Sequence, residues 1–428
     1  MIRAGVSVVD ITPPAGLAMS GFAARVEPAS GAHDPLTVRA LVVGDSAIAI
    51  ADVIGIDAAL SARVRLASGL PPEKVTLAAT HTHGGPVSMA GRLAGAAAPA
   101  FLDRLEAGFL TALRRARETM EPVTLHGGTG TEPGIARNRR RPDGPVDRGV
   151  PVLRLDRADG SVMAVLVSYA CHPVVLSSDN LLWTADYPHY VRTALEAALP
   201  GAVALFATGC AGDVNTGHSA AASLDPARHP LRSYAEAERI GRAVAASALA
   251  APLRPLGESV SAGEAFAELS FAPDDDLPAQ RAAWQAERET APPIRARMLD
   301  IWIDWAARLA ADNPPPLMER VTAANWGGAR LLAMPGEIFA RTAQELREAM
   351  GAGSSAPLFV LGYADDNPGY IPPEGEFAFG GYEVNEAHRF YGLPAGLAPR
   401  SAERLATAVL NAAGGQHHDE TSKGDCHD

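Results

Sequence analysis

The sequence has few cysteines, and they are not spaced for a disulfide framework. Only Cys171, Cys210 and Cys426 occur in 428 residues, an odd number without a paired spacing. A chain of this length, with 47% hydrophobic and 20% charged residues, can bury a large core without cross-links. The composition therefore indicates a globular protein from a reducing compartment.

Positive charge is also scarce. The chain carries 37 lysines and arginines against 49 aspartates and glutamates, a formal net charge of -12, and its basic cluster is the short run Arg139–Arg141. Such a surface cannot release counterions from a phosphate backbone, so a nucleic-acid partner is not expected. We expect a small-molecule substrate, and the sequence leaves an oligomer possible.

Long hydrophobic runs are missing. No stretch approaches the ~20 apolar residues that cross a bilayer, and no amphipathic membrane helix is evident. The N-terminus lacks the basic head and apolar run of a signal peptide. We therefore expect a cytoplasmic protein without stable membrane association.

Short apolar runs that end in polar residues recur along the chain. Apolar runs of this kind, bounded by Gly and Pro, predict buried strands, which are typically four to eight residues long. The runs cover residues 40–50, 74–79, 162–169, 202–207, 331–334 and 358–361. Helical patterns alternate with them, over residues 100–120, 190–199, 233–250 and 337–350. This order predicts an α/β fold with a mixed β-sheet core, flanking helices and a metal site at the carboxyl ends of strands.

Two segments stand apart from this alternation. Residues 274–313 predict a helical insertion of two helices, 280–289 and 294–311, separated by Pro292-Pro293; either a lid or a core-packing insertion fits. Residues 414–428 are polar and are predicted to be a disordered tail. One domain over residues 1–413 remains.

Two histidines follow the predicted strand at 74–79. Alternate residues of an extended chain share a face, so the imidazoles of His81 and His83 can reach one site. Zinc binds imidazole nitrogen and carboxylate oxygen and keeps a position open for water at catalytic sites. The pair alone fits two hydrogen-bonded structural histidines equally well. His172, at another strand end before Pro173, favours a metal site.

Neither of two familiar histidine-pair motifs fits. The metallo-β-lactamase pattern requires Asp and a third His directly after the pair, where this chain has Gly84-Gly85-Pro86. The amidohydrolase barrel places the pair on its first strand, whereas here at least one apolar strand precedes it.

The segment Thr80-His81-Thr82-His83-Gly84-Gly85-Pro86 instead resembles the metal-binding segment of the neutral ceramidase family. Further elements similar to that family occur in its order along most of the chain: Asp10–Pro14, Asn138-Arg139, Cys171-His172-Pro173, Gly209–Asn215, Pro335-Gly336-Glu337 and Gly369–Pro372. The resemblance implies that residues 1–413 form a ceramidase-like catalytic domain. It also implies one zinc ion coordinated by His81, His172, Glu337 and Tyr370.

This ligand set implies a zinc-dependent hydrolase, because zinc lowers the pKa of bound water towards ~7 and so activates it for attack on an amide or ester carbonyl. His83 is expected to hold the oxyanion or to shuttle a proton. Arg139 is expected to bind substrate oxygens, Tyr370 to act in catalysis as well as in binding the metal, and Asp186 to contact substrate.

The chain departs from the family at Asn215, where ceramidases carry a serine. Its amide can bond a substrate carbonyl but cannot act as a hydroxyl nucleophile. Ceramidases also have a further C-terminal domain after the point where this chain ends. We therefore expect a smaller, more soluble amide, ester or lactone than ceramide. A zinc-dependent lyase or isomerase of the same fold, or a non-catalytic metal-binding protein, are the alternatives.

Overall fold

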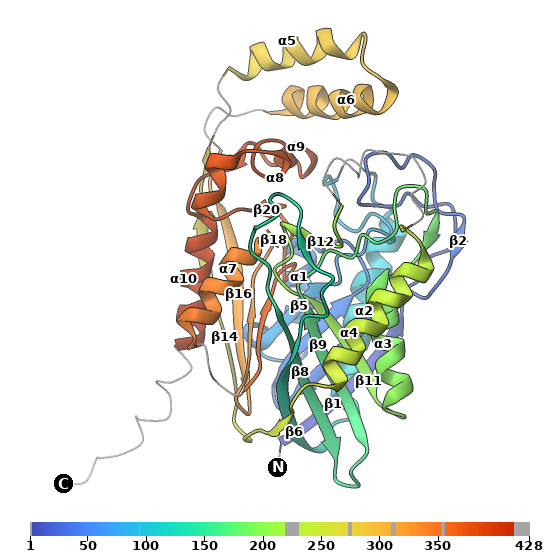
Figure 1. Ribbon diagram of the computed structural model, residues 1–428, viewed down its shortest axis with the longest axis vertical. Coiled ribbons are helices and arrows are strands. Elements are labelled where there is room, and N and C mark those ends of the chain that lie inside the picture. Colours follow the sequence, from blue (N-terminus) through green and yellow to red (C-terminus); the bar gives the residue numbers. More distant parts are fainter. Residues whose placement is uncertain are drawn as a thin grey trace, which may run out of the picture.

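Two β-sheets pack face to face, and helices cover the outer face of each (Figure 1). The computed structural model describes residues 2–93, 95–218, 231–272, 276–309, 314–351 and 356–414. The predicted α/β class with a mixed sheet core and flanking helices is therefore confirmed.

The larger sheet has nine strands in the order β11-β9-β8-β6-β1-β3-β4-β5, with β13 paired to β6. It is mixed, because β11 pairs with β9 and β4 with β5 in parallel, while its other pairs are antiparallel. Its strands are β1 (Ile2–Asp10), β3 (Thr37–Val43), β4 (Ser46–Ala51), β5 (Val75–Ala79), β6 (Glu121–Thr131), β8 (Gly149–Arg157), β9 (Val162–Tyr169), β11 (Val203–Thr208) and β13 (Arg254–Pro255).

The smaller sheet has the order β14-β16-β17-β19, with only the last pair parallel. Its strands are β14 (Val260–Leu269), β16 (Leu317–Trp326), β17 (Ala329–Ala333) and β19 (Leu358–Leu361). Four two-stranded pairs form in the connecting loops: β2 (Gly31–Ala32) with β10 (Leu182–Trp183), β7 (Arg137–Asn138) with β12 (Val214–Asn215), β15 (Phe271–Ala272) with β21 (Gly396–Leu397), and β18 (Glu337–Ile338) with β20 (Tyr370–Ile371).

Alternation along β3 shows why the sheets stack. Val38, Ala40 and Val42 face the helices on one side, whereas Leu41 and Val43 face the second sheet. The outer face of the larger sheet is covered by α1 (Ala58–Ala67), α2 (Pro99–Glu118), α3 (Tyr187–Ala198) and α4 (Tyr234–Leu249). The outer face of the smaller sheet is covered by α7 (Ala340–Ala349) and α10 (Ser401–Gly414).

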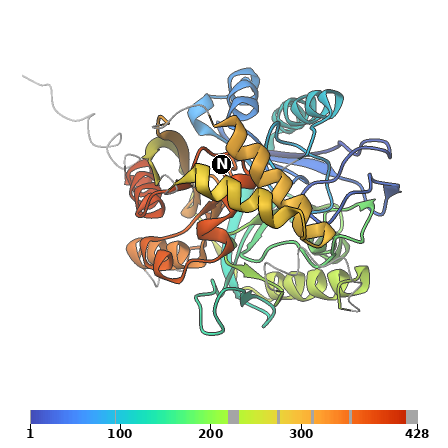
Figure 2. The same cartoon turned by 90° about the horizontal axis from the view of Figure 1, so that it is seen from above.

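A helical hairpin lies across the top of the molecule. It consists of α5 (Leu277–Arg288) and α6 (Pro293–Arg308), which confirms the predicted two-helix insertion; residues 310–311 at the end of the predicted second helix lie outside the described residues. Figure 2 shows the two helices crossing above the body of the protein. Beneath them lie the short helices α8 (Tyr382–Asn385) and α9 (Ala387–Phe390), and the cluster of buried Trp284, Trp302 and Trp305 includes Phe390 of α9. Two 3-10 helices, η1 (Pro72–Lys74) and η3 (Glu374–Phe379), complete the described helical segments.

Two sequence expectations were wrong. The apolar run at 40–50 is two strands, because the chain turns at Gly44, whose φ of 60° suits glycine, and β3 and β4 pair antiparallel across the turn. The predicted helix from Glu337 begins only at Ala340, because Glu337 and Ile338 pair in parallel with Tyr370 and Ile371. The predicted tail lies outside the described residues from 415 onward, and Gly414 ends α10.

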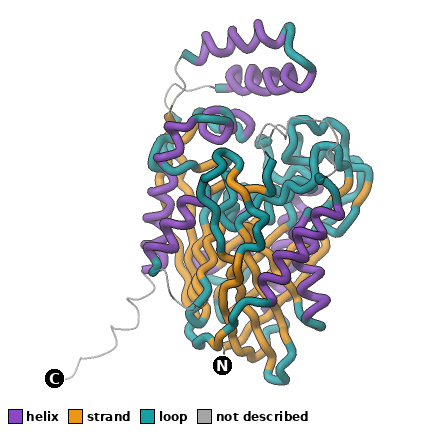
Figure 3. Tube along the Cα trace, in the orientation of Figure 1, coloured by secondary structure: helices purple, strands orange, loops and turns teal. Residues whose placement is uncertain are grey.

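The carboxyl ends of several strands meet between the two sheets. Isolated bridges join Ala78 to Ala364 and Gly209 to Leu361, so β5, β11 and β19 end beside one another. Figure 3 shows loops gathered at this end of the strands, below the helical hairpin. The polar residues that follow these strands are therefore brought to one place.

Candidate metal centre

Three histidines and a glutamate converge at these strand ends. The ligand atoms of His81, His83 and His172 all lie within 4.8 Å of one another. Glu337 Oε2 lies 2.9 Å from Nε2 of His172 and 3.3 Å from Nε2 of His81. His81, His172 and Glu337 are each at most 1% exposed. The structure thus brings together the strand-end residues that the sequence singled out.

The backbone fixes the tautomer of two imidazoles. Nδ1 of His81 lies 2.6 Å from the carbonyl oxygen of Ile54, and Nδ1 of His172 lies 2.5 Å from that of Ala211. A carbonyl only accepts, so each Nδ1 carries a proton, and each Nε2 is the nitrogen left to face the centre of the cluster. Metal-ligating histidines are oriented in this way.

Both Nε2 atoms point at a carboxylate oxygen. Burial, followed by the charge of Arg139, lowers the pKa of His172 to about 4, so its ring is neutral near pH 7. Burial alone would raise the pKa of Glu337, but His81 and His172 outweigh it and hold the pKa well below its usual range. Two ring nitrogens and a carboxylate oxygen that converge in this way, with each Nδ1 already bonded to the backbone, form a donor set that fits a metal ion.

His83 reaches this cluster differently from the way its spacing suggested. The chain is not extended at His81, whose φ is 62°, yet Nε2 of His83 lies 3.4 Å from Nε2 of His81. The ring of His83 packs against Phe22, with centroids 4.9 Å apart. Its Nδ1 is buried and has no hydrogen-bond partner within the described part of the chain. Burial, and then His81, lowers its pKa well below the usual value.

Arg139 lies in an ion pair beside the cluster. Its Nε donates to Glu383 Oε1 at 2.8 Å, and one of its terminal nitrogens donates to the Tyr370 hydroxyl at 2.9 Å. Glu383 also accepts from Arg140 at 2.6 Å. Burial raises the pKa of Tyr370 well above its usual value, and Arg139 opposes that rise. The positive charge of Arg139 is therefore directed at the Tyr370 oxygen.

Asn215 and Asp186 are engaged by their own loops. The Asn215 amide donates to the carbonyl of His218 and accepts from the backbone N–H groups of Gly217 and His218. The Asp186 carboxylate accepts from the backbone N–H groups of Leu176 and Tyr187 at the start of α3. Burial raises the pKa of Asp186 to about 6. Their substrate contacts stay predictions.

Two tyrosines near the cluster were not predicted. The Tyr363 ring stacks on His81, with centroids 4.1 Å apart, and the Tyr391 hydroxyl donates to Glu337 Oε1. Tyr363 closely follows β19, so the same strand-end reasoning finds it in retrospect. Tyr391 directly follows the short helix α9, and no periodicity or motif marks it.

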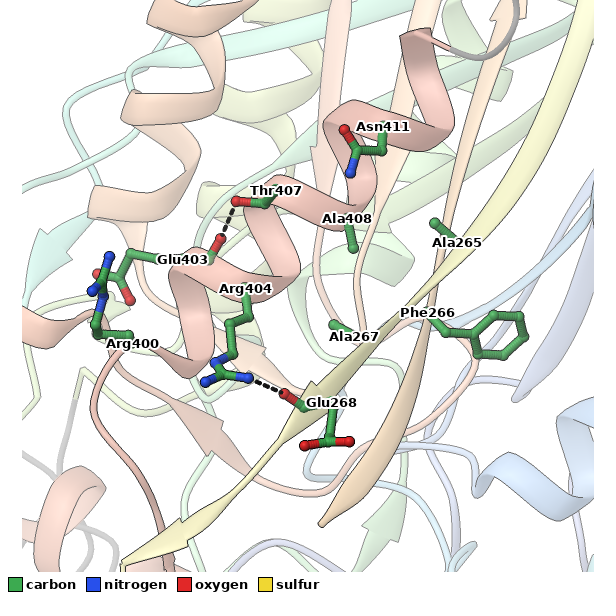
Figure 4. A pocket seen from close by; sticks show the side chains of 10 residues that line it. All are labelled: Ala265, Phe266, Ala267, Glu268, Arg400, Glu403, Arg404, Thr407, Ala408 and Asn411. Carbon is green, nitrogen blue, oxygen red and sulfur yellow. Dashed lines mark hydrogen bonds between the residues drawn. The ribbon is translucent and has the colours of Figure 1, made fainter.

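A groove of about 440 Å³ lies elsewhere, between β14 and α10 (Figure 4). Its walls include Ala265, Phe266 and Asn411, and Arg404 donates to the Glu268 carbonyl at 3.4 Å. None of its lining residues belongs to the histidine cluster.

A buried set of imidazoles and a carboxylate at strand ends could hold a metal ion of the kind that hydrolytic enzymes use. The sequence pattern of the neutral/alkaline non-lysosomal ceramidases, in its N-terminal part, matches residues 2–225. This is more than half of the chain, and the protein belongs to that family. Its members are metal-dependent hydrolases, so the chain is an enzyme of the hydrolase class.

Solved structures agree on the fold. The neutral ceramidase from Pseudomonas aeruginosa superposes with a TM-score of 0.74 at 19% sequence identity, over 96% of this chain and 74% of that chain. A ceramidase complexed with C2 superposes with a TM-score of 0.73, at the same identity and coverage. No curated protein matches the sequence significantly. None of the described helices is both long and apolar enough to cross a membrane.

Proposed function

We propose that the protein is a zinc-dependent hydrolase that cleaves an amide or ester bond of a small soluble substrate. The observation that carries this proposal is the convergence of two imidazole nitrogens, from His81 and His172, on the Glu337 carboxylate. Family membership supports the hydrolytic chemistry.

Zinc is proposed because of the donor types and their spacing. Donors that lie about 2.0–2.1 Å from a tetrahedral zinc ion are about 3.4 Å from one another. The separations of 3.3 Å from His81 and 2.9 Å from His172 to Glu337 Oε2 are close to that value. We assign a fourth protein donor to the phenol oxygen of Tyr370, to which Arg139 donates a hydrogen bond, and a fifth position remains for water. When bound, zinc polarises a carbonyl and lowers the pKa of the water consumed in hydrolysis.

His83 is assigned to proton transfer rather than to the metal. Its Nδ1 lacks the carbonyl partner that orients His81 and His172. Its pKa is lowered, so the ring is neutral and can accept a proton from the attacking water and return it to the leaving group. Phe22 packs on the ring and limits its rotation.

The proposal of a small substrate rests on Asn215. In place of a serine hydroxyl, the site has an amide whose oxygen and nitrogen both bond the 215–218 turn. Within the described residues, one N–H of that amide has no hydrogen-bond partner, and it is proposed to hold the substrate carbonyl, with Asp186 and Arg139 also proposed to contact the substrate.

The test is a substrate screen with zinc-loaded enzyme. Short N-acyl amides, esters, lactones and ceramide are incubated with the protein, and the products are followed by mass spectrometry. The proposal predicts that one small substrate gives products whose summed mass exceeds its own by one water. This activity should disappear when the metal is removed by a chelator and in His172→Ala. Products of unchanged summed mass would overturn hydrolysis. Cleavage of ceramide alone would overturn the substrate class.

A further inference from the structure

We propose that the helical hairpin α5–α6 is a positioning element for the metal-binding carboxylate, which it holds in place through Tyr391. The inference rests on the proposed function, because it takes Glu337 as a metal ligand. In this role the hairpin is a static part of the metal centre that positions Glu337, and not a lid that opens and closes.

Tyr391 determines how Glu337 is presented. Its hydroxyl donates to Oε1, which leaves Oε2 facing His81 and His172. Both partners are buried, so the bond is shielded from competing water. A partner of this kind fixes the rotation of a ligating carboxylate, and its loss typically weakens metal binding 10–100-fold.

The hairpin contacts the chain on both sides of Tyr391. On one side, the Arg389 guanidinium carbon lies 4.7 Å from the ring centroid of Trp302 and 4.9 Å from that of Trp284. On the other side, the indole N–H of Trp305 donates to the Leu393 carbonyl at 2.6 Å. Cation–π contacts are strongest where water is excluded, as it is around the buried Arg389.

The hairpin is itself tied to the rest of the site. Ala23 and Leu93, from two other loops, pack against its tryptophan cluster. The backbone N–H of Leu93 donates to the carbonyl of Phe390 at 2.6 Å. The segment that carries Tyr391 therefore lies between the hairpin and the loop of Leu93, which follows the His81 motif, and contacts both.

A double-mutant cycle on zinc affinity tests the inference. Trp305→Phe removes the bond to Leu393 while keeping an aromatic ring, and Tyr391→Phe removes the bond to Glu337. Zinc dissociation constants are measured by competition with a chromophoric chelator for the parent, both single variants and the double variant. Gln285→Ala, on the exposed face of α5, is the matched control. Thermal unfolding verifies that each variant is folded.

The inference predicts a 10–100-fold weaker zinc affinity for Tyr391→Phe and a several-fold loss for Trp305→Phe. The double variant should bind zinc no more weakly than Tyr391→Phe alone, because both changes act through one bond. Unchanged affinity in folded Trp305→Phe, or effects that multiply in the double variant, would overturn it. If Trp305→Phe does not fold, Trp302→Phe takes its place in the same cycle. A parent that binds no zinc would instead refute the proposed function.

Discussion

The Asp213 carboxyl group joins its own loop to Asn138 and to Ala340 at the start of α7. Its raised pKa is the electrostatic property that we test first. One oxygen accepts from the backbone N–H of Ala340 at 2.8 Å, and the other accepts from the Asn138 amide at 2.6 Å. The side chain is buried, and burial raises its pKa from 3.8 to about 6 although both bonds oppose the rise. The perturbation is Asp213→Asn, which removes the titration and keeps an acceptor of similar shape.

The magnitude and sign follow from linkage. A rise of about two pKa units corresponds to about 3 kcal/mol. The folded state binds this proton more tightly than the unfolded state, so folding is favoured below the unfolded pKa. That contribution is lost as the pH rises from about 4 through about 6. The parent should therefore lose stability over this interval relative to Asp213→Asn.

The assay is urea unfolding of both proteins between pH 4 and 7.5. The free energy of unfolding of the variant minus that of the parent should increase by about 3 kcal/mol up to about pH 6 and then level off. A difference in the free energy of unfolding that is the same at every pH does not affect the test, because the test concerns only how this difference changes with pH. A difference that is flat, or that falls with rising pH, would refute the assignment of a raised pKa to Asp213.

Two further predictions concern His83 and the core. Gly21→Ala should reduce kcat while leaving the zinc content unchanged, because a Cβ at this position would lie 2.4 Å from Nδ1 of His83 and displace its ring. Gly16→Ala is the control for backbone strain in the same kinetic assay, because Gly16 has a similar φ but open space around it. Arg192→Met should cost about 3–5 kcal/mol in urea unfolding, because it leaves the fully buried Asp52 carboxylate unpaired. The exposed pair of Arg63 gives the comparison, since Arg63→Met should cost less than about 1 kcal/mol; equal costs would contradict the argument from burial.

The sequence predicted the parts of the fold that local patterns encode. The helical hairpin was predicted as two helical stretches, residues 280–289 and 294–311, separated by Pro292-Pro293. The meeting of His81, His172 and Glu337 followed from the rule that polar residues gather where strands end. Even so, His83 reaches the cluster through a left-handed turn at His81, which alternation along a strand does not foresee.

Other features depend on contacts that local patterns do not carry. Glu337 was placed at a helix start, but two-residue pairing with Tyr370, remote in sequence, holds it in β18. The predicted substrate contact of Arg139 stays a prediction, and its ion pair with Glu383 could not be foreseen because it depends on a loop more than two hundred residues away. Tyr391 has no signal at all, because its role arises only when that loop folds over Glu337.

The zinc content of the purified protein tests the central claim most directly. It is measured by elemental analysis of the parent, His172→Ala and His83→Ala after equal exposure to zinc and removal of the excess. The account predicts one zinc ion per chain in the parent, almost none in His172→Ala and nearly the parental amount in His83→Ala. Zinc retained in folded His172→Ala, or no zinc in the parent, would contradict it.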